Sequence, residues 1–229
     1  MKYKSIWFDL GMTLVEPFTE KAYRQVLEQL DIKASPEAVK RAFYLADKTF
    51  MREYPHVLGS NPDIFLPWYI GVANYHLGVR TNLQQACLAY RQEMQKQKNR
   101  WRLMPGAKEL LLALRRRGIH TGLLSNWDAT CREVLRQNGL DALLQSVVIS
   151  SEVGAEKPDR AIFEAALRQA DIPPEQTLFV GDNYYDDVLG AQKCNIRCLL
   201  LAPYGRLGME EINHRPTIAS LGEVLNHLE

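Results

Sequence analysis

Short apolar runs that alternate with helical patterns limit the fold of this chain more than any other feature. Most of these runs lack a polar residue at every second position, which is typical of strands covered on both faces. The runs are SIWFDL (5–10), IHTGLLS (119–125), SVVIS (146–150), TLFVGD (177–182) and IRCLLL (196–201). Because helical patterns separate the runs after residue 100, we predict an α/β fold with a Rossmann-like, doubly wound parallel sheet.

The helical patterns after residue 100 carry recognisable ends. They are PGAKELLLALRRRG (105–118), DATCREVLRQNG (128–139), PDRAIFEAALRQA (158–170) and YDDVLGAQKC (185–194). Gly118 and Gly139 stand where helix C-caps belong, and Pro105 and Pro158 suit first helical turns. We therefore expect four helices between the strands.

Residues 16–99 have a different character, because strand signals disappear and helical patterns dominate. These patterns cover 19–30, 35–54, 61–78 and 83–98. We predict an α-helical cap domain at 16–99, inserted into a core domain formed by 1–15 and 100–229. Such an insertion is suited to form a lid over the carboxyl ends of the strands, and residues 100–102 would be its hinge.

Composition excludes several classes of function. The chain has 229 residues and is 46% hydrophobic, which is enough for a large α/β core and a smaller domain. Its net charge of +1 offers no field for nucleic acid or a membrane surface, and no apolar stretch approaches the roughly 20 residues of a transmembrane helix. The four cysteines, Cys87, Cys131, Cys194 and Cys198, lack metal-site spacing. We expect reduced thiols, no signal peptide and a cytoplasmic protein.

Polar side chains follow four of the predicted strands. They are Asp9, then Ser125 and Asn126, then Lys157, and finally Asp182, Asn183, Asp186 and Asp187. Taken singly, these residues also suit helix caps, first-turn acids or a solvated lysine. Because the carboxyl ends of parallel strands meet at one edge of the sheet, we expect the side chains to converge there.

Four segments together resemble the haloacid dehalogenase (HAD) superfamily of hydrolases, which are mostly phosphatases. The segments are FDLGMTL (8–14), LLSN (123–126), EKPD (156–159) and VGDNYYDD (180–187). The insertion after the first segment is similar to the helical cap of one branch of the family. The resemblance implies a hydrolase that acts on a small phosphorylated metabolite, as a monomer or homodimer.

The resemblance also implies roles for individual residues. Asp9 would be the nucleophile that forms an aspartyl-phosphate, with Lys157 and Ser125 as catalytic partners. Mg²⁺ would be bound by Asp9, the backbone carbonyl of Gly11 and Asp182, with Asp187 binding directly or through water. An all-oxygen site of this kind suits Mg²⁺.

Phosphate binding is implied for a second, overlapping set. Ser125, Asn126 and Lys157 would contact the phosphoryl group, and Thr13 would support the loop after the first strand. Phosphoryl transfer depends mainly on such positioning and charge.

Gly11 departs from the family pattern, because standard members carry there a carboxylate that protonates the leaving group and activates water. General acid–base catalysis is typically worth about 10²–10⁴ in rate, whereas enzymes accelerate phosphate-monoester hydrolysis by up to about 10²¹. We therefore expect activity to survive and to favour good leaving groups. Five residues of the 16–99 region are alternative proton donors: Glu16, Glu20, Tyr23, His56 and Tyr69.

Two other functions stay open. A 2-haloacid dehalogenase also lacks this carboxylate and needs no metal, although VGDNYYDD keeps the acidic cluster of the phosphatases. A catalytically weakened protein that binds phosphate or a partner is the other alternative. Gly11 and Met12 favour the latter, and the retention of Asp9, Lys157 and Asp182 argues against it.

Overall fold

The computed structural model describes residues 2–97 and 99–228, and its contacts divide the chain into two compact units. The α/β unit contains the residues up to Glu16, Trp101–Arg206 and the residues from Glu210 onward. The helical unit contains Pro17–Arg100 together with Leu207–Met209. The role of the helical unit as a lid stays a prediction.

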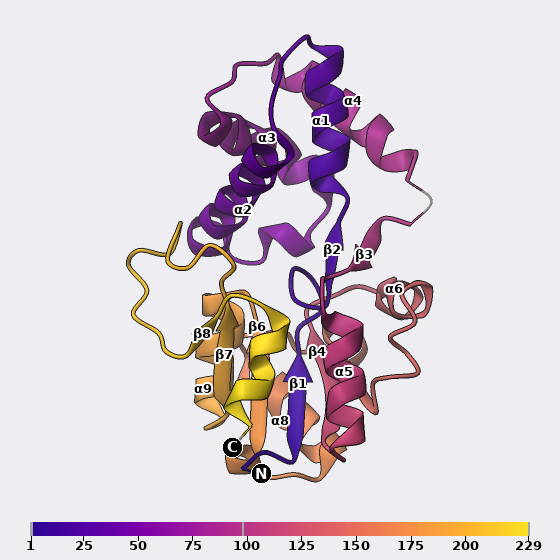
Figure 1. Ribbon diagram of the computed structural model, residues 1–229, viewed down its shortest axis with the longest axis vertical. Helices are drawn as coiled ribbons and strands as arrows, with labels where there is room; N and C mark the ends of the chain where they lie inside the picture. Colours follow the sequence, from indigo (N-terminus) through magenta and orange to yellow (C-terminus); the bar gives the residue numbers. More distant parts are fainter. Residues whose placement is uncertain (1, 98, 229) are drawn as a thin grey trace. The chain divides into compact units, whose positions relative to one another are not determined.

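A six-stranded parallel sheet forms the centre of the α/β unit (Figure 1). Its strand order is β5 (Ser146–Ile149), β4 (His120–Ser125), β1 (Ser5–Phe8), β6 (Thr177–Gly181), β7 (Arg197–Leu201) and β8 (Thr217–Ile218). At the carboxyl end of β1, Phe8 pairs with Leu123 on one side and Val180 on the other. The strand order thus reverses at β1, and the predicted doubly wound parallel sheet is confirmed.

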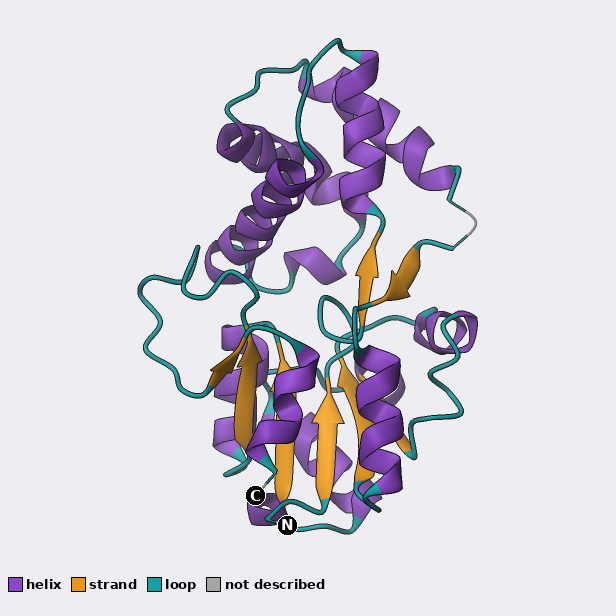
Figure 2. Ribbon diagram, in the orientation of Figure 1, coloured by secondary structure: helices purple, strands orange, loops and turns teal. Residues whose placement is uncertain are grey.

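Helices cover both faces of this sheet (Figure 2). They are α5 (Ala107–Arg116), α6 (Cys131–Gln137), α7 (Ser150–Val153), α8 (Arg160–Ala170), the π-helical turn η3 (Tyr184–Val188), α9 (Leu189–Lys193), and the 3₁₀ segments η2 (Pro174–Gln176) and η4 (Leu221–His227). Gly118 and Gly139 have φ angles of 68° and 64° just beyond α5 and α6, as their predicted capping role requires.

The two prolines do not begin helices, which corrects the sequence prediction. Pro105 lies in a turn, and α5 starts after Gly106, whose left-handed backbone precedes the helix. Pro158 follows Lys157 through a cis peptide bond, and Asp159 is the N-cap of α8. The Asp159 side chain accepts a hydrogen bond from the Ala161 N–H, so Asp159, and not Pro158, marks the start of this helix.

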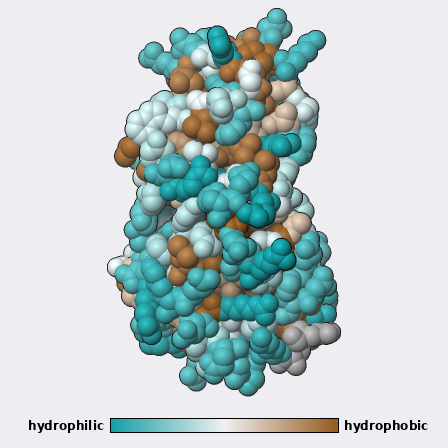
Figure 3. Space-filling view, turned by 90° about the vertical axis from the view of Figure 1, so that its left-hand side faces the viewer, coloured by the Kyte–Doolittle hydropathy of each residue, from teal (hydrophilic) through white to brown (hydrophobic). Residues whose placement is uncertain are grey.

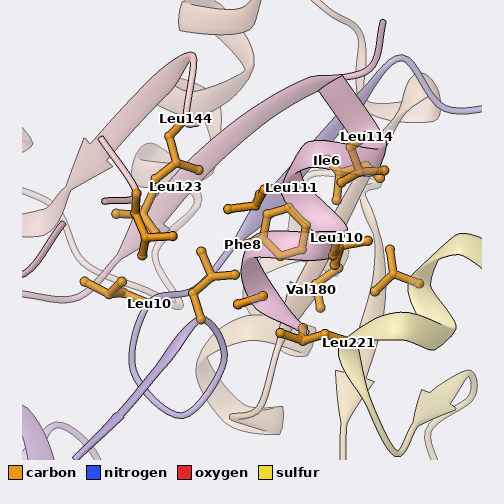
Figure 4. Close-up of a cluster of buried hydrophobic side chains, with 14 of the residues drawn as sticks. Ile6, Phe8, Leu10, Leu110, Leu111, Leu114, Leu123, Leu144, Val180 and Leu221 are labelled. Atoms are coloured by element: carbon orange, nitrogen blue, oxygen red, sulfur yellow. The ribbon is translucent and has the colours of Figure 1, made fainter. Parts of the chain in front are cut away.

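The main hydrophobic core fills one side of the sheet (Figure 4). Side chains of β1 and of Leu10, two residues beyond the strand, meet leucines of α5 and Leu221 of η4. These residues include Ile6, Phe8, Leu10, Leu110, Leu111, Leu114 and Leu221. On the opposite face, Phe163 of α8 packs edge-on against Phe179 of β6 with ring centroids 5.4 Å apart. Burial on both faces explains why the strands read as unbroken apolar runs.

The helical unit has its own core. It contains α1 (Thr19–Gln29), α2 (Pro36–Glu53), η1 (Val57–Gly59), α3 (Pro62–Leu77) and α4 (Leu83–Gln95). Buried Tyr23, Phe43 and Ile70 belong to its hydrophobic cluster. The predicted helix over 83–98 ends on residue 98, which lies outside the described residues. Some apolar side chains of α3 and α4 are exposed, and Figure 3 shows hydrophobic residues reaching the molecular surface.

A two-stranded ribbon lies where the hinge is expected, and the hinge motion itself stays a prediction. Strands β2 (Val15–Pro17) and β3 (Trp101–Leu103) pair where the chain leaves and re-enters the α/β unit. The buried carboxylate of Glu16 accepts hydrogen bonds from the Arg102 guanidinium at 2.9 and 3.0 Å. Both strands are only three residues long, too short for a period to appear in the sequence.

The segment Leu207–Met209 belongs to the helical unit although it lies far along the chain from Arg100. A Cβ atom on Gly208 would stand 3.0 Å from Leu45 and 3.2 Å from Lys48, both in α2. Met209 is only 4% exposed. In the described part of the chain, every helix is too short or too polar to cross a membrane.

Candidate functional site

Asp9 lies at the carboxyl end of β1, where the strand order reverses. Its backbone N–H donates to the carbonyl of Val180 at 2.9 Å, which continues the pairing with β6 for one residue. Loops after neighbouring strands on either side diverge at such a point and leave room for a ligand. The Asp9 side chain is 13% exposed, so it is held by the protein and still accessible.

Two donors orient the Asp9 carboxylate. The Ser125 hydroxyl, at the end of β4, donates to Oδ1 at 2.8 Å. The Lys157 ammonium donates to the same oxygen, also at 2.8 Å. Among the described residues, both of these contacts are to Oδ1 and leave Oδ2 available. An ionised carboxylate with one free oxygen is a suitable nucleophile.

Lys157 is buried between two carboxylates. Its ammonium is 2.8 Å from Asp9 and 2.6 Å from Asp187. Burial alone would lower the pKa of Lys157, but the charges and hydrogen bonds of Asp187 and Asp9 outweigh burial, and the pKa is raised. The side chain therefore carries a permanent positive charge next to Asp9.

Asn126 holds the main chain of Lys157. The Asn126 amide donates through Nδ2 to the Lys157 carbonyl at 2.9 Å and accepts from the Lys157 N–H at 2.7 Å. The side-chain amide thus pairs with both main-chain groups of Lys157, as one backbone segment pairs with another in a sheet. The amide positions Lys157 in this way, and the expected contact of Asn126 with a phosphoryl group stays a prediction.

Asp187 is the most deeply buried carboxylate of the site. It accepts from Lys157, and its Oδ2 accepts from the Asn183 N–H at 2.9 Å within the turn that leads into η3. Burial, with the negative charges of Asp9 and Asp182, raises the pKa of Asp187 to about 7, against the opposing effect of Lys157. The protein thus buries more negative charge here than its one lysine neutralises.

Gly181 makes room for Asp187. A Cβ atom on Gly181 would stand 2.1 Å from Oδ2 of Asp187, so no larger residue fits at the end of β6. Asp186 lies outside this cluster and accepts from the Asn183 amide at 2.8 Å, as a helix-start acid would.

The loop after β1 supplies two further contacts. The buried Thr13 hydroxyl donates to Asp182 at 3.3 Å, which ties this loop to the end of β6. Met12 has a φ of 53°, a conformation that favours glycine. The chain therefore adopts a left-handed turn at Met12 although the residue is not glycine.

Three carboxylates form a group with the character of a hard-cation site. One oxygen from each of Asp9, Asp182 and Asp187 lies within 4.8 Å of the others. Oxygen ligands from a few carboxylates, completed by water, suit Mg²⁺. The surplus negative charge around Lys157 would be offset by a cation at this position. The residues present therefore fit the Mg²⁺ ion that the sequence implies.

Three of the five alternative proton donors have other contacts. Tyr23 donates to Asn74, and Tyr69 donates to Asp47, both inside the helical unit. Burial and the charge of Asp47 raise the pKa of Tyr69 well above its ordinary value, which makes it a poor acid. Glu16 pairs with Arg102 in the β2–β3 ribbon.

This α/β unit has a partly buried carboxylate at the strand-order reversal, with a lysine and further carboxylates beside it, an arrangement expected of a Rossmann-like hydrolase. The chain belongs to the haloacid dehalogenase-like hydrolases, whose family model matches residues 3–195. The structure and this match agree on an enzyme.

Curated relatives match this chain over part or all of its length. Haloacid dehalogenase-like hydrolase domain-containing protein 3 of Homo sapiens is 28% identical, over 96% of this chain and 92% of its own. Its Xenopus laevis counterpart is 36% identical over 45% of this chain, a match that spans only 42% of the relative's length. The glyceraldehyde 3-phosphate phosphatase of Pyrococcus furiosus is 26% identical, over 100% of this chain and 94% of its own.

Solved structures share the fold. The HAD-hydrolase YfnB from Bacillus subtilis, bound to magnesium, superposes with a TM-score of 0.67 at 20% identity, over 100% of this chain and 99% of that one. A dehalogenase gives a TM-score of 0.65 at 19% identity, over 99% and 97%. At these identities the likeness concerns the fold alone.

Proposed function

We propose that this hydrolase is a Mg²⁺-dependent phosphohydrolase that acts on a small phosphorylated metabolite through an aspartyl-phosphate on Asp9. The observation that carries the proposal is the Asp9 carboxylate, oriented by Ser125 and Lys157 and bordered by two further carboxylates. The name of the Pyrococcus furiosus relative, a glyceraldehyde 3-phosphate phosphatase, supports a phosphate ester as substrate.

In the first step, Asp9 Oδ2 attacks phosphorus, the new O–P bond forms and the bond to the leaving oxygen breaks. The leaving group departs with the bonding electron pair. Lys157 offsets the charge on the carboxylate and the transferring group, and the Ser125 hydroxyl turns from Asp9 to a phosphoryl oxygen. Placed donors of this kind stabilise a phosphoryl-transfer transition state.

In the second step, water attacks the phosphorus of phospho-Asp9, which releases inorganic phosphate and restores the carboxylate. Gly11 has no group to protonate the leaving oxygen in the first step or to activate this water. Without a donor at position 11, the leaving group accepts a proton from solvent or departs as an anion, which favours groups of low pKa, and Glu20 and His56 stay open as alternative donors.

A divalent cation would be held by Asp9, Asp182 and Asp187, with the Gly11 carbonyl as the expected further ligand. Bound there, Mg²⁺ supplies the positive charge that lets two anions meet. Asp182 is oriented for this role by Thr13, and Asp187 by Lys157 and Asn183.

The first experiment is a screen of phosphorylated metabolites with Mg²⁺, run beside Asp9→Asn. We expect phosphate release by the unchanged protein and none by the variant. Chloride release from a 2-haloacid in the presence of EDTA would instead establish the dehalogenase alternative. A biological activity that Asp9→Asn leaves intact would establish the binding-protein alternative.

The second experiment measures the dependence on the leaving group. Across phosphate esters of graded leaving-group pKa, we expect kcat/KM to fall steeply as that pKa rises, because no acid assists departure. Phospho-Asp9 should accumulate with the best leaving groups, since its hydrolysis also lacks a base. A flat series would contradict the role given to Gly11.

A further inference from the structure

The indole of Trp127 faces the place where a side chain at position 11 would stand. A Cβ atom built on Gly11 would lie 3.3 Å from Cζ3 of Trp127, and among the described residues other than its chain neighbours no other atom stands within 4 Å. Ordinary carbon–carbon contacts are about 3.5–4.0 Å, so the ring already borders the space beside Gly11. Gly11 is two residues from Asp9, and Trp127 is two residues from Ser125, the donor to Asp9.

Several contacts fix the position of this indole. The Trp127 backbone N–H donates to the Ser150 hydroxyl at 3.0 Å, and that hydroxyl also lies 3.2 Å from the Trp127 carbonyl. The indole Nε1–H donates to Thr130 Oγ1 at 3.1 Å. Trp101 of β3 packs on the ring with centroids 4.7 Å apart and planes at 60°. The ring therefore needs little reordering to receive a ligand.

The surroundings of the ring leave it partly accessible. Trp127, Trp101 and Gly11 are all half-buried. The edge of an aromatic ring thus borders the site at the position where standard family members have a carboxylate. A leaving group there meets this aromatic edge and no proton donor from residue 11.

We propose that Gly11 and Trp127 form a subsite for an aromatic leaving group, so that aryl phosphate monoesters are the substrate class that this site selects. This inference rests on the proposed function. Aryl leaving groups depart as anions of low pKa and need no acid. Their rings can also pack against the indole, and aromatic pairs attract each other beyond the effect of the area they bury.

The test compares two substrates that both have good leaving groups, phenyl phosphate with an electron-withdrawing ring substituent and acetyl phosphate. Only the first can contact the indole. With the full chain and Mg²⁺, we expect Trp127→Ala to lower kcat/KM for the aryl ester about tenfold, mainly through KM. Acetyl phosphate should change by less than about twofold, and Trp127→Phe should keep most of the preference because a ring remains. An equal loss for both substrates, or no loss for the aryl ester, would overturn the subsite.

A binding measurement separates this subsite from the proposed reaction. In the Asp9→Asn background with Mg²⁺, calorimetry compares phenylphosphonate with methylphosphonate, neither of which is hydrolysed. We expect the phenyl compound to bind more tightly and Trp127→Ala to remove the difference. If that preference is present but the unchanged enzyme releases no phosphate from any ester, the subsite stands and the proposed reaction fails. If the reaction is present without the preference, the subsite fails alone.

Discussion

At the scale of single residues, charge dominates the candidate site. Asp9, Asp182 and Asp187 crowd around one ammonium, and a buried carboxylate is stable only when it is paired or protonated. The pKa of Asp187, raised to about 7 by burial and its acidic neighbours, expresses this surplus. A bound divalent cation would remove it.

Mg²⁺ affinity should therefore depend on pH. Below about pH 7 a proton competes for Asp187, so the affinity should fall by up to about tenfold per pH unit, and above pH 7 it should be constant. Isothermal titration with Mg²⁺ from pH 5 to pH 8 checks this. Asp187→Asn should abolish the dependence near pH 7, and an unchanged affinity in the native protein would contradict the prediction.

The same pKa shift has a consequence for stability. Because the folded pKa lies above the ordinary value of 3.8, the folded protein holds this proton more tightly than the unfolded chain. Without a cation, the contribution of Asp187 to the free energy of unfolding should fall as pH rises from about 4 to about 7. Saturating Mg²⁺ should oppose that loss.

Gly181 offers a test of the carboxylate geometry. In Gly181→Ala, the new Cβ would stand 2.1 Å from Asp187 Oδ2, so Asp187 must move and Mg²⁺ affinity should fall at least about tenfold. Gly122→Ala is the matched control, since its Cβ would meet Trp7 at 2.5 Å, away from the carboxylates. Both should lower the free energy of unfolding by about 1–3 kcal/mol, as overpacking does. Equal Mg²⁺ affinities in the two variants would be evidence against this geometry.

At the scale of elements, continuous apolar runs predict the main strands well, and sequence patterns predict the special turns poorly. The five apolar runs become strands because helices cover both faces of the sheet and bury them. The predicted helix starts at 105 and 158 were wrong, because the start of a helix depends on backbone angles that the sequence pattern does not show. At the second site, the Asp159 carboxylate after Pro158 caps the helix. Strands β2, β3 and β8 are too short for any period to be visible.

The candidate site, too, is predicted in part from the sequence. The order of the strand ends predicts that Asp9, Ser125, Lys157 and Asp187 meet, and their contacts show that they do. The amide clamp of Asn126 and the position of Trp127 were not predicted, because both depend on how two loops face each other. The NW dipeptide after LLS was the only signal.

The C-cap of α5 gives a prediction at this scale. Gly118 has a φ of 68° and open space around a Cβ position. Gly118→Ala should therefore lower stability only through the strain of a left-handed backbone on alanine. We expect a loss of about 1 kcal/mol in the free energy of unfolding, measured with urea. Gly59 also has open space but no positive φ, so Gly59→Ala should change stability by less than about 0.5 kcal/mol in the unfavourable direction. Equal losses would show that φ is not the cause.

At the scale of the whole molecule, the cysteines report on global unfolding. All four are free and buried. Burial raises the pKa of Cys131 to about 12, with further increases from nearby acids, and raises the pKa of Cys198 well above its ordinary value. At pH 8 we expect iodoacetamide to label the folded protein only slowly and all four thiols rapidly in denaturant. Fast labelling of Cys131 or Cys198 under native conditions would contradict this.

The segment Leu207–Met209 affects how this enzyme can be recombined with its relatives. Because it packs within the helical unit, the chain enters that unit twice, at Pro17 and again at Leu207. A chimera that exchanges only residues 17–100 would leave Met209 and Gly208 facing a foreign α2. Grafting the helical unit intact between relatives therefore requires two donor segments, the long insertion and this tripeptide, taken from the same parent.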